Sequence, residues 1–68
     1  MTDTKALRDI IKERGIKYKR LAEELSLSPY GLQKKIENDT EFKISEVSRL
    51  AKMLNMSVDE REQIFFAS

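Results

Sequence analysis

The sequence contains no cysteine and no histidine, and only two glycines and one proline among 68 residues. Without cysteine or histidine, the chain cannot form a disulfide, a redox Cys-x-x-Cys pair, a Cys/His zinc site or a histidine-based catalytic triad. We therefore expect no metal, no cofactor, no small-molecule substrate and no enzymatic activity. An enzyme would have to rest on carboxylates, which are far commoner on protein surfaces than in catalytic sites.

Long hydrophobic runs are also absent. The longest unbroken apolar run covers four residues, 64–67, whereas a helix that crosses a bilayer needs about 20. No apolar segment near Met1 resembles a secretory signal. These absences favour a cytoplasmic protein without a membrane partner, and the length favours a single domain over residues 1–68. Such a domain buries only about 60% of its unfolded surface, so helix packing, a second copy or both must stabilise it.

The charges are unevenly distributed, although the formal net charge is only +1. Residues 1–38 hold nine lysines and arginines against six acidic residues, which gives +3, and residues 39–68 hold four against six, which gives −2. Arg14, Lys17 and Arg20 lie in one stretch of seven residues. A basic surface of this kind suits phosphates, and from charge alone a merely solvated surface is an equally good interpretation.

Apolar residues recur at helical spacing along the chain, and no stretch alternates with period two. The sequence therefore predicts an all-α fold, a compact bundle of about five short helices over residues 4–14, 18–25, 28–37, 45–54 and 57–66. The residues that this periodicity places in the core are Leu7, Ile10, Ile11, Leu21, Leu25, Leu32, Ile36, Val47, Leu50 and Leu54.

Local residues mark several of the helix ends. Gly15 suits the left-handed residue after the first helix, and Ser28 followed by Pro29 is a strong start for the third helix. Ser57 and Glu60 have the spacing of a capping box, in which each side chain accepts a hydrogen bond from the other residue's backbone N–H. These positions predict helix ends independently of the apolar periodicity.

The most informative segment is 18–37, YKRLAEELSLSPYGLQKKIE. Two short helices joined by a turn, with the small Ala22 where they cross and an apolar wedge between them, have the spacing of a helix-turn-helix. Leu32 and Ile36 give the second of these helices a narrow apolar stripe, so most of its surface faces something other than the core. The chain resembles the lambda-repressor-like family, the Cro and C1-type repressor proteins of bacteriophages and their bacterial relatives. The resemblance extends over almost the whole chain.

Three positions depart from the family pattern. Ser26 stands where glycine is usual in the turn, so either serine tolerates a positive φ or the turn bends without one. Lys17 stands where serine or threonine often caps the second helix. Pro29 replaces a frequent glutamine and can make only apolar contacts, so base selectivity at that position should be looser.

The resemblance implies a sequence-specific transcriptional regulator of the repressor type, whose third helix enters the major groove of double-stranded operator DNA. It implies that Gln33 pairs with adenine and Lys34 with guanine. Lys35 is equally expected to be a solvated lysine. The alternative for Tyr30 is packing against its own turn of the third helix, and the alternative for Tyr18 is a half-buried ring that packs the second helix against Ile16. The base-contacting residues implied by position are Ser28, Pro29, Tyr30, Gln33 and Lys34, and the phosphate-contacting residues are Tyr18, Lys19, Lys35, Asn38 and Lys43.

The neighbouring Phe65 and Phe66 point about 100° apart on a helix, so only one can easily enter the core. Both are candidate contacts in a homodimer, which would match the family's palindromic operators, and a Phe66 that merely frays near the chain end is the alternative. A second interpretation of the whole chain is a helical adaptor that binds an antirepressor-like or antitoxin-like protein partner in place of DNA. Its support is the acidic segment 39–68 and the phenylalanine pair.

Overall fold

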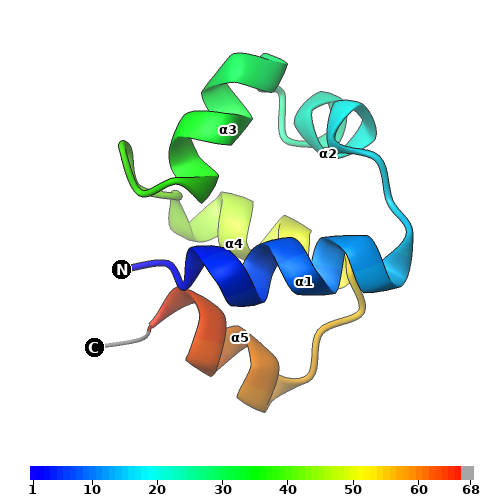
Figure 1. Ribbon diagram of the computed structural model, residues 1–68, viewed down its shortest axis with the longest axis vertical. Coiled ribbons are helices and arrows are strands. Elements are labelled where there is room, and N and C mark those ends of the chain that lie inside the picture. The colour runs from blue at the N-terminus through cyan, green and yellow to red at the C-terminus, as the bar shows by residue number, and fades with distance from the viewer. Residues whose placement is uncertain (67–68) are drawn as a thin grey trace.

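The computed structural model describes residues 1–66, and within them the helices follow the predicted apolar periodicity (Figure 1). In order, they are α1 (Thr4–Arg14), α2 (Tyr18–Glu24), α3 (Pro29–Ile36), α4 (Ile44–Met53) and α5 (Val58–Phe65). No strand occurs in this part of the chain, so the predicted all-α architecture is confirmed. None of these helices is long and apolar enough to cross a membrane.

The predicted helix ends are confirmed where a capping residue marks them. α1 begins after Asp3, whose side chain accepts a hydrogen bond from the Ala6 N–H at 3.1 Å. Ser28 caps α3 by accepting from the Gly31 N–H at 3.0 Å, and Pro29 takes the first helical position. The capping box between Ser57 and Glu60 opens α5. Each cap satisfies backbone N–H groups that the first turn of a helix leaves unpaired.

Three of these helices end at a residue with left-handed backbone. Gly15 follows α1 with a φ of 72°, and Asn38 and Asn55 follow α3 and α4 with φ values of 66° and 51°. Asparagine tolerates this conformation better than most residues that carry a Cβ. Ser26 in the turn between α2 and α3 also has a positive φ, 57°, so here serine adopts the conformation in which glycine is usual.

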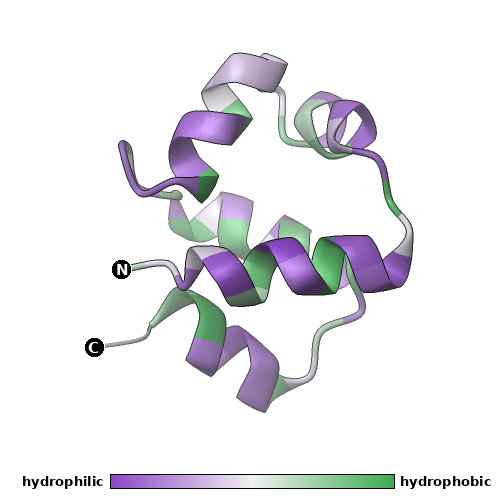
Figure 2. Ribbon diagram, viewed as in Figure 1, coloured by the Kyte–Doolittle hydropathy of each residue, from purple (hydrophilic) through white to green (hydrophobic). Residues whose placement is uncertain are grey.

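The hydrophobic core forms where the inner sides of the helices meet. Every residue predicted to be in the core is buried, and Ala22, Ile64 and Phe65 join them. Figure 2 shows the hydrophobic segments of α1, α4 and α5 interleaved with hydrophilic ones, whereas α3 is mostly pale or hydrophilic. α3 contributes only Leu32 and Ile36 to the core. The helix is therefore anchored along a narrow line and leaves most of its surface uncovered.

The start of the chain ties α1 to the end of α3 and to α5. The Thr4 hydroxyl donates to the Ile36 carbonyl at 2.6 Å, and the Asp3 N–H donates to the Ile64 carbonyl at 2.6 Å. In Figure 1 the N-terminal segment accordingly lies between the end of α3 and the end of α5. These bonds fix the C-terminal end of α3 against the body of the domain.

Candidate nucleic-acid interface

The outer side of α3 carries polar and aromatic side chains that the rest of the domain does not cover. Pro29 and Gln33 are exposed, and 69% of Tyr30 is accessible to solvent. Lys34 is half-buried, with its ammonium nitrogen 5.5 Å from the centroid of the Tyr30 ring. This cation–π contact between positions i and i+4 leaves both side chains on the helix surface. The predicted base-contacting residues therefore lie together along one exposed helix.

Ser28 has a structural role as well. Its Oγ accepts the capping hydrogen bond from Gly31, which leaves the hydroxyl proton available for donation. Gly31 is suited to this cap, because a Cβ at that position would lie 3.2 Å from the Ser28 Oγ. Glycine at position 31 therefore leaves room for the Ser28 hydroxyl that caps α3.

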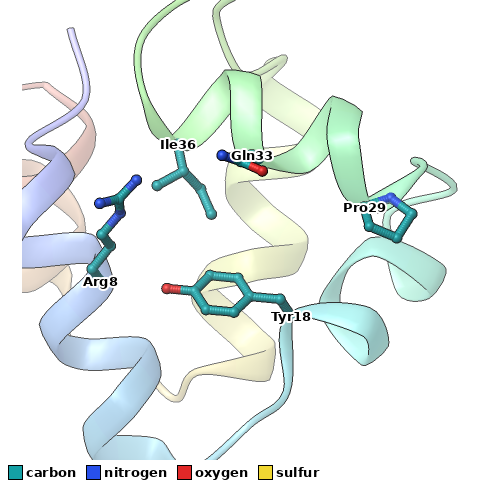
Figure 3. Close-up of a pocket in the computed structure, with 5 residues that line it drawn as sticks. All are labelled: Arg8, Tyr18, Pro29, Gln33 and Ile36. Atoms are coloured by element: carbon teal, nitrogen blue, oxygen red, sulfur yellow. The ribbon is translucent and has the colours of Figure 1, made fainter.

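A hollow of about 280 Å³ separates the N-terminal ends of α2 and α3 from α1. Arg8, Tyr18, Pro29, Gln33 and Ile36 line it. Figure 3 shows the Tyr18 hydroxyl directed toward the Arg8 side of the hollow, with Gln33 and Ile36 above it. Three helices thus bring a guanidinium, a phenol and an amide to one concave surface. The guanidinium and the phenol, together with the unpaired N–H groups at the start of α2, can bind a phosphate group.

Arg8 is the member of this hollow that the sequence analysis did not identify. Its guanidinium Nη2 donates to Glu37 Oε2 at 3.0 Å, across 29 residues of sequence. The same carboxylate oxygen accepts a longer hydrogen bond, 3.4 Å, from Gln33 Nε2. Nothing in the local sequence separates Arg8 from the other charged residues of α1, because only the tertiary packing places it beside α3.

Two of the predicted phosphate contacts, Lys19 and Lys43, are exposed. Lys43 precedes α4, and its backbone N–H donates to Glu46 Oε1 at 2.8 Å. The Lys43 side chain has no acceptor and does not cap the helix itself. Both ammonium groups are placed where solvent, or a polyanion, can reach them.

Lys35 is not a solvated lysine, and its predicted phosphate contact needs correction. Its Nζ donates to Glu46 Oε1 at 2.7 Å and to the Glu41 carbonyl at 3.3 Å, and its side chain is only 12% exposed. Burial alone would raise the pKa of Glu46. The hydrogen bonds from Lys35 and from the Lys43 N–H, with the charges of both lysines, lower the Glu46 pKa below its ordinary value. Lys35 thus holds α3 against α4.

Asn38 is exposed, but its side-chain amide is hydrogen-bonded to the start of the chain. Its Oδ1 accepts from the Thr2 N–H at 3.0 Å, and its Nδ2 donates to the Thr2 carbonyl at 2.6 Å. Both polar atoms of the amide therefore hold the N-terminal segment. Asn38 thus has a structural role, and the phosphate contact predicted for it stays a prediction.

The two phenylalanines near the end of α5 have different environments. Phe65 is buried and contacts Phe42 edge-to-face, with ring centroids 5.6 Å apart. Phe66 remains largely exposed. The prediction that only one of the pair enters the core is confirmed. Both residues still line one hollow, so the dimer contact predicted for them stays a prediction.

A family model described as Cro/C1-type HTH DNA-binding domain matches residues 6–60. The matched region runs from the first turn of α1 into α5 and includes the whole of α2 and α3. Comparisons with curated proteins and with solved structures found no match.

Proposed function

The chain belongs to the family of Cro/C1-type HTH DNA-binding domains, and from this premise we propose that it is a regulator that binds double-stranded DNA sequence-selectively. In this proposal residues 1–68 act as a single domain, α3 enters the major groove, and α2 lies across the phosphate backbone. The exposure of α3 carries the proposal, because a helix that gives only Leu32 and Ile36 to the core leaves a side available for a groove. Binding to an operator would exclude polymerase without any chemical step.

Gln33 and Lys34 would provide most of the base selectivity. The Gln33 amide can donate to and accept from adenine, and the Lys34 ammonium can donate to guanine N7 and O6. Each good pair of this kind discriminates against a wrong base by about 1–3 kcal/mol. Pro29 and Tyr30 would add apolar contacts, for instance with a thymine methyl, and Ser28 would lie at the rim.

The phosphate contacts would come from three elements around α3. Tyr18 and Arg8 share the hollow beside the start of α2, and Lys19 and Lys43 are exposed on α2 and before α4. With the charge of Arg8 balanced by Glu37, the cations Lys19, Lys34 and Lys43 would neutralise about three phosphates per chain. At about 0.9 per phosphate, the slope of log affinity against log salt should be about −2 to −3 for each bound chain.

The experiment that tests this proposal is selection of bound duplexes from random DNA, followed by affinity measurements against salt. We expect a defined consensus and a negative slope of the stated size. The double variant Gln33→Ala with Lys34→Ala should lose preference for the consensus. The matched control, Gln63→Ala with Lys52→Ala, changes the same residue types at exposed sites on α5 and α4 and should keep it. A flat salt dependence would remove DNA as the ligand and favour a protein-binding adaptor.

We further propose that a second copy of the chain covers the exposed apolar side chains near both termini. Met1, Ile44 and Phe66, which are 82%, 83% and 58% exposed, line one hollow of about 200 Å³ together with Phe42 and Val47. A patch that holds both projecting apolar side chains and a hollow can pair with a second copy of itself across a two-fold axis. Two chains related in this way would match a palindromic site.

Sedimentation equilibrium, with and without the selected duplex, tests this second copy. We expect association that is weakened by Ile44→Ser combined with Phe66→Ser. Val58→Ser is the matched control, because Val58 is 69% exposed but does not line the hollow. Equal effects of the two changes, or a consensus without two-fold symmetry, would contradict the dimer.

A further inference from the structure

Glu37 is a carboxylate placed at the edge of a surface that is proposed to meet a polyanion. It follows α3 directly, and its Oε2 accepts from Arg8 Nη2 at 3.0 Å and from Gln33 Nε2 at 3.4 Å. We infer that Glu37 is a specificity-determining positioning residue, which holds Arg8 and Gln33 and raises discrimination between right and wrong DNA sites. This inference rests on the proposed function, because Gln33 is the proposed adenine contact.

The hydrogen bond to Glu37 determines which groups Gln33 presents to the groove. A glutamine amide has two N–H donors and one carbonyl acceptor. One N–H points to Glu37, which leaves one N–H and the carbonyl oxygen for a base. One donor and one acceptor are what adenine N7 and N6 require. The carboxylate therefore reduces the orientations of a flexible side chain to those that suit one base, before any DNA is bound.

The ion pair between Glu37 and Arg8 affects the affinity for DNA of any base sequence. While Arg8 is paired with Glu37, its charge is balanced, and the carboxylate itself repels nearby phosphates. Both effects weaken contacts with any DNA backbone. The orientation of Gln33 restores affinity only at a site with the matching base. Glu37 thus lowers affinity for unrelated DNA more than affinity for the selected site.

Asp39 provides a matched control for the charge. It lies two residues after Glu37 in the same exposed segment, and its side chain makes no hydrogen bond or ion pair with other residues in 1–66. Glu37→Gln and Asp39→Asn each remove one negative charge while keeping nearly the same shape. A general electrostatic effect will appear in both variants, whereas loss of positioning will appear only in Glu37→Gln.

The experiment measures binding of the wild type and both variants to the selected duplex and to one with the Gln33-contacted base pair changed. We expect Glu37→Gln to bind the changed duplex several-fold more tightly than the wild type does. The ratio of its affinities for the selected and the changed duplex should fall about tenfold. The slope of its log affinity against log salt should become steeper by about one. Adding Arg8→Ala should abolish that extra slope. Asp39→Asn should shift both affinities equally. Thermal melting of each variant verifies that folding is unchanged.

Equal discrimination in Glu37→Gln and Asp39→Asn would overturn the role of Glu37 while leaving the DNA-binding function intact. If the wild type selects no duplex, the proposed function itself fails and the role of Glu37 fails with it. The two failures are distinguished by the wild-type measurement alone.

Discussion

Replacing Lys35 with alanine tests how α3 is held in place. The Lys35 ammonium donates to Glu46 Oε1 and to the Glu41 carbonyl, and the paired side chains of Lys35 and Glu46 are 12% and 9% exposed. Glu46 also accepts from the Lys43 N–H, so a single carboxylate joins α3, the following segment and the start of α4. Removing the ammonium leaves this carboxylate in a poorly hydrated site without its cation. The variant should be strongly destabilised.

The magnitude follows from the bonds that are lost. Both are donated by a charged ammonium, and a hydrogen bond to a charged group contributes about 1.5–3 kcal/mol. Breaking one partner of a buried ion pair costs about 3–5 kcal/mol. We therefore expect Lys35→Ala to lower the free energy of unfolding by about 3 kcal/mol. For a domain of this length, such a loss lowers Tm by about 12 to 24 °C.

Urea unfolding followed by circular dichroism measures this loss, and Lys5→Ala is the matched control. The Lys5–Asp9 pair has nearly the same N···O distance, 2.8 Å, but its side chains are 86% and 63% exposed. An exposed pair of this kind contributes far less, because solvent screens its charges and both side chains lose conformational freedom when they pair. Comparable losses in the two variants would refute the conclusion that burial decides the strength of these pairs. Lys35→Met combined with Glu46→Leu removes both charges and should lose only about 1 kcal/mol, which is the contribution of the capping hydrogen bond that Glu46 accepts from the Lys43 N–H.

Two further predictions concern pH and the turns. Since the folded pKa of Glu46 is lowered, its pair stabilises the fold above the unfolded carboxyl pKa, about 4.3, and this contribution is lost as pH falls through the folded pKa. Acid titration of stability should therefore be shallower in the Lys35→Met and Glu46→Leu double variant, and an unchanged profile would contradict this. In chemical denaturation, Gly15→Ala should destabilise by about 1 kcal/mol and Ser26→Gly should stabilise by about 0.5–1 kcal/mol. Both residues have positive φ, and a Cβ at Gly15 would meet no atom within 4 Å, so the cost is conformational. Effects of the same sign would refute the argument.

The helices and the core could be predicted from the sequence because their determinants are local. The cap at Ser28, the capping box at Ser57 and the left-handed Gly15 each involve residues within one turn of a helix end. Apolar periodicity identifies the inner side of each helix without knowledge of what it packs against. Apolar periodicity also predicts the exposure of Gln33, because this residue lies outside the stripe that Leu32 and Ile36 form.

The partners of polar side chains could not be predicted, because they depend on how distant segments pack. Lys34 and Lys35 are neighbours in sequence, yet only Lys35 lies against Glu46 on α4. Asn38 bonds to Thr2, which is 36 residues away. Arg8 likewise reaches the hollow beside Tyr18 only after α1 has packed. A charged residue that looks solvated in the sequence can thus become a structural contact, or a member of the interface.

NMR titration with the selected duplex tests most directly whether the exposed side of α3 is the DNA-binding surface. We expect the largest amide shift changes at Tyr18 and Lys19 and along residues 30–34, with a slower-exchanging side-chain amide at Gln33. Changes in α5 should be small, apart from any near Phe66 that accompany association of two chains. Changes centred on α5, with the outer side of α3 unaffected, would contradict this assignment of the DNA-binding surface.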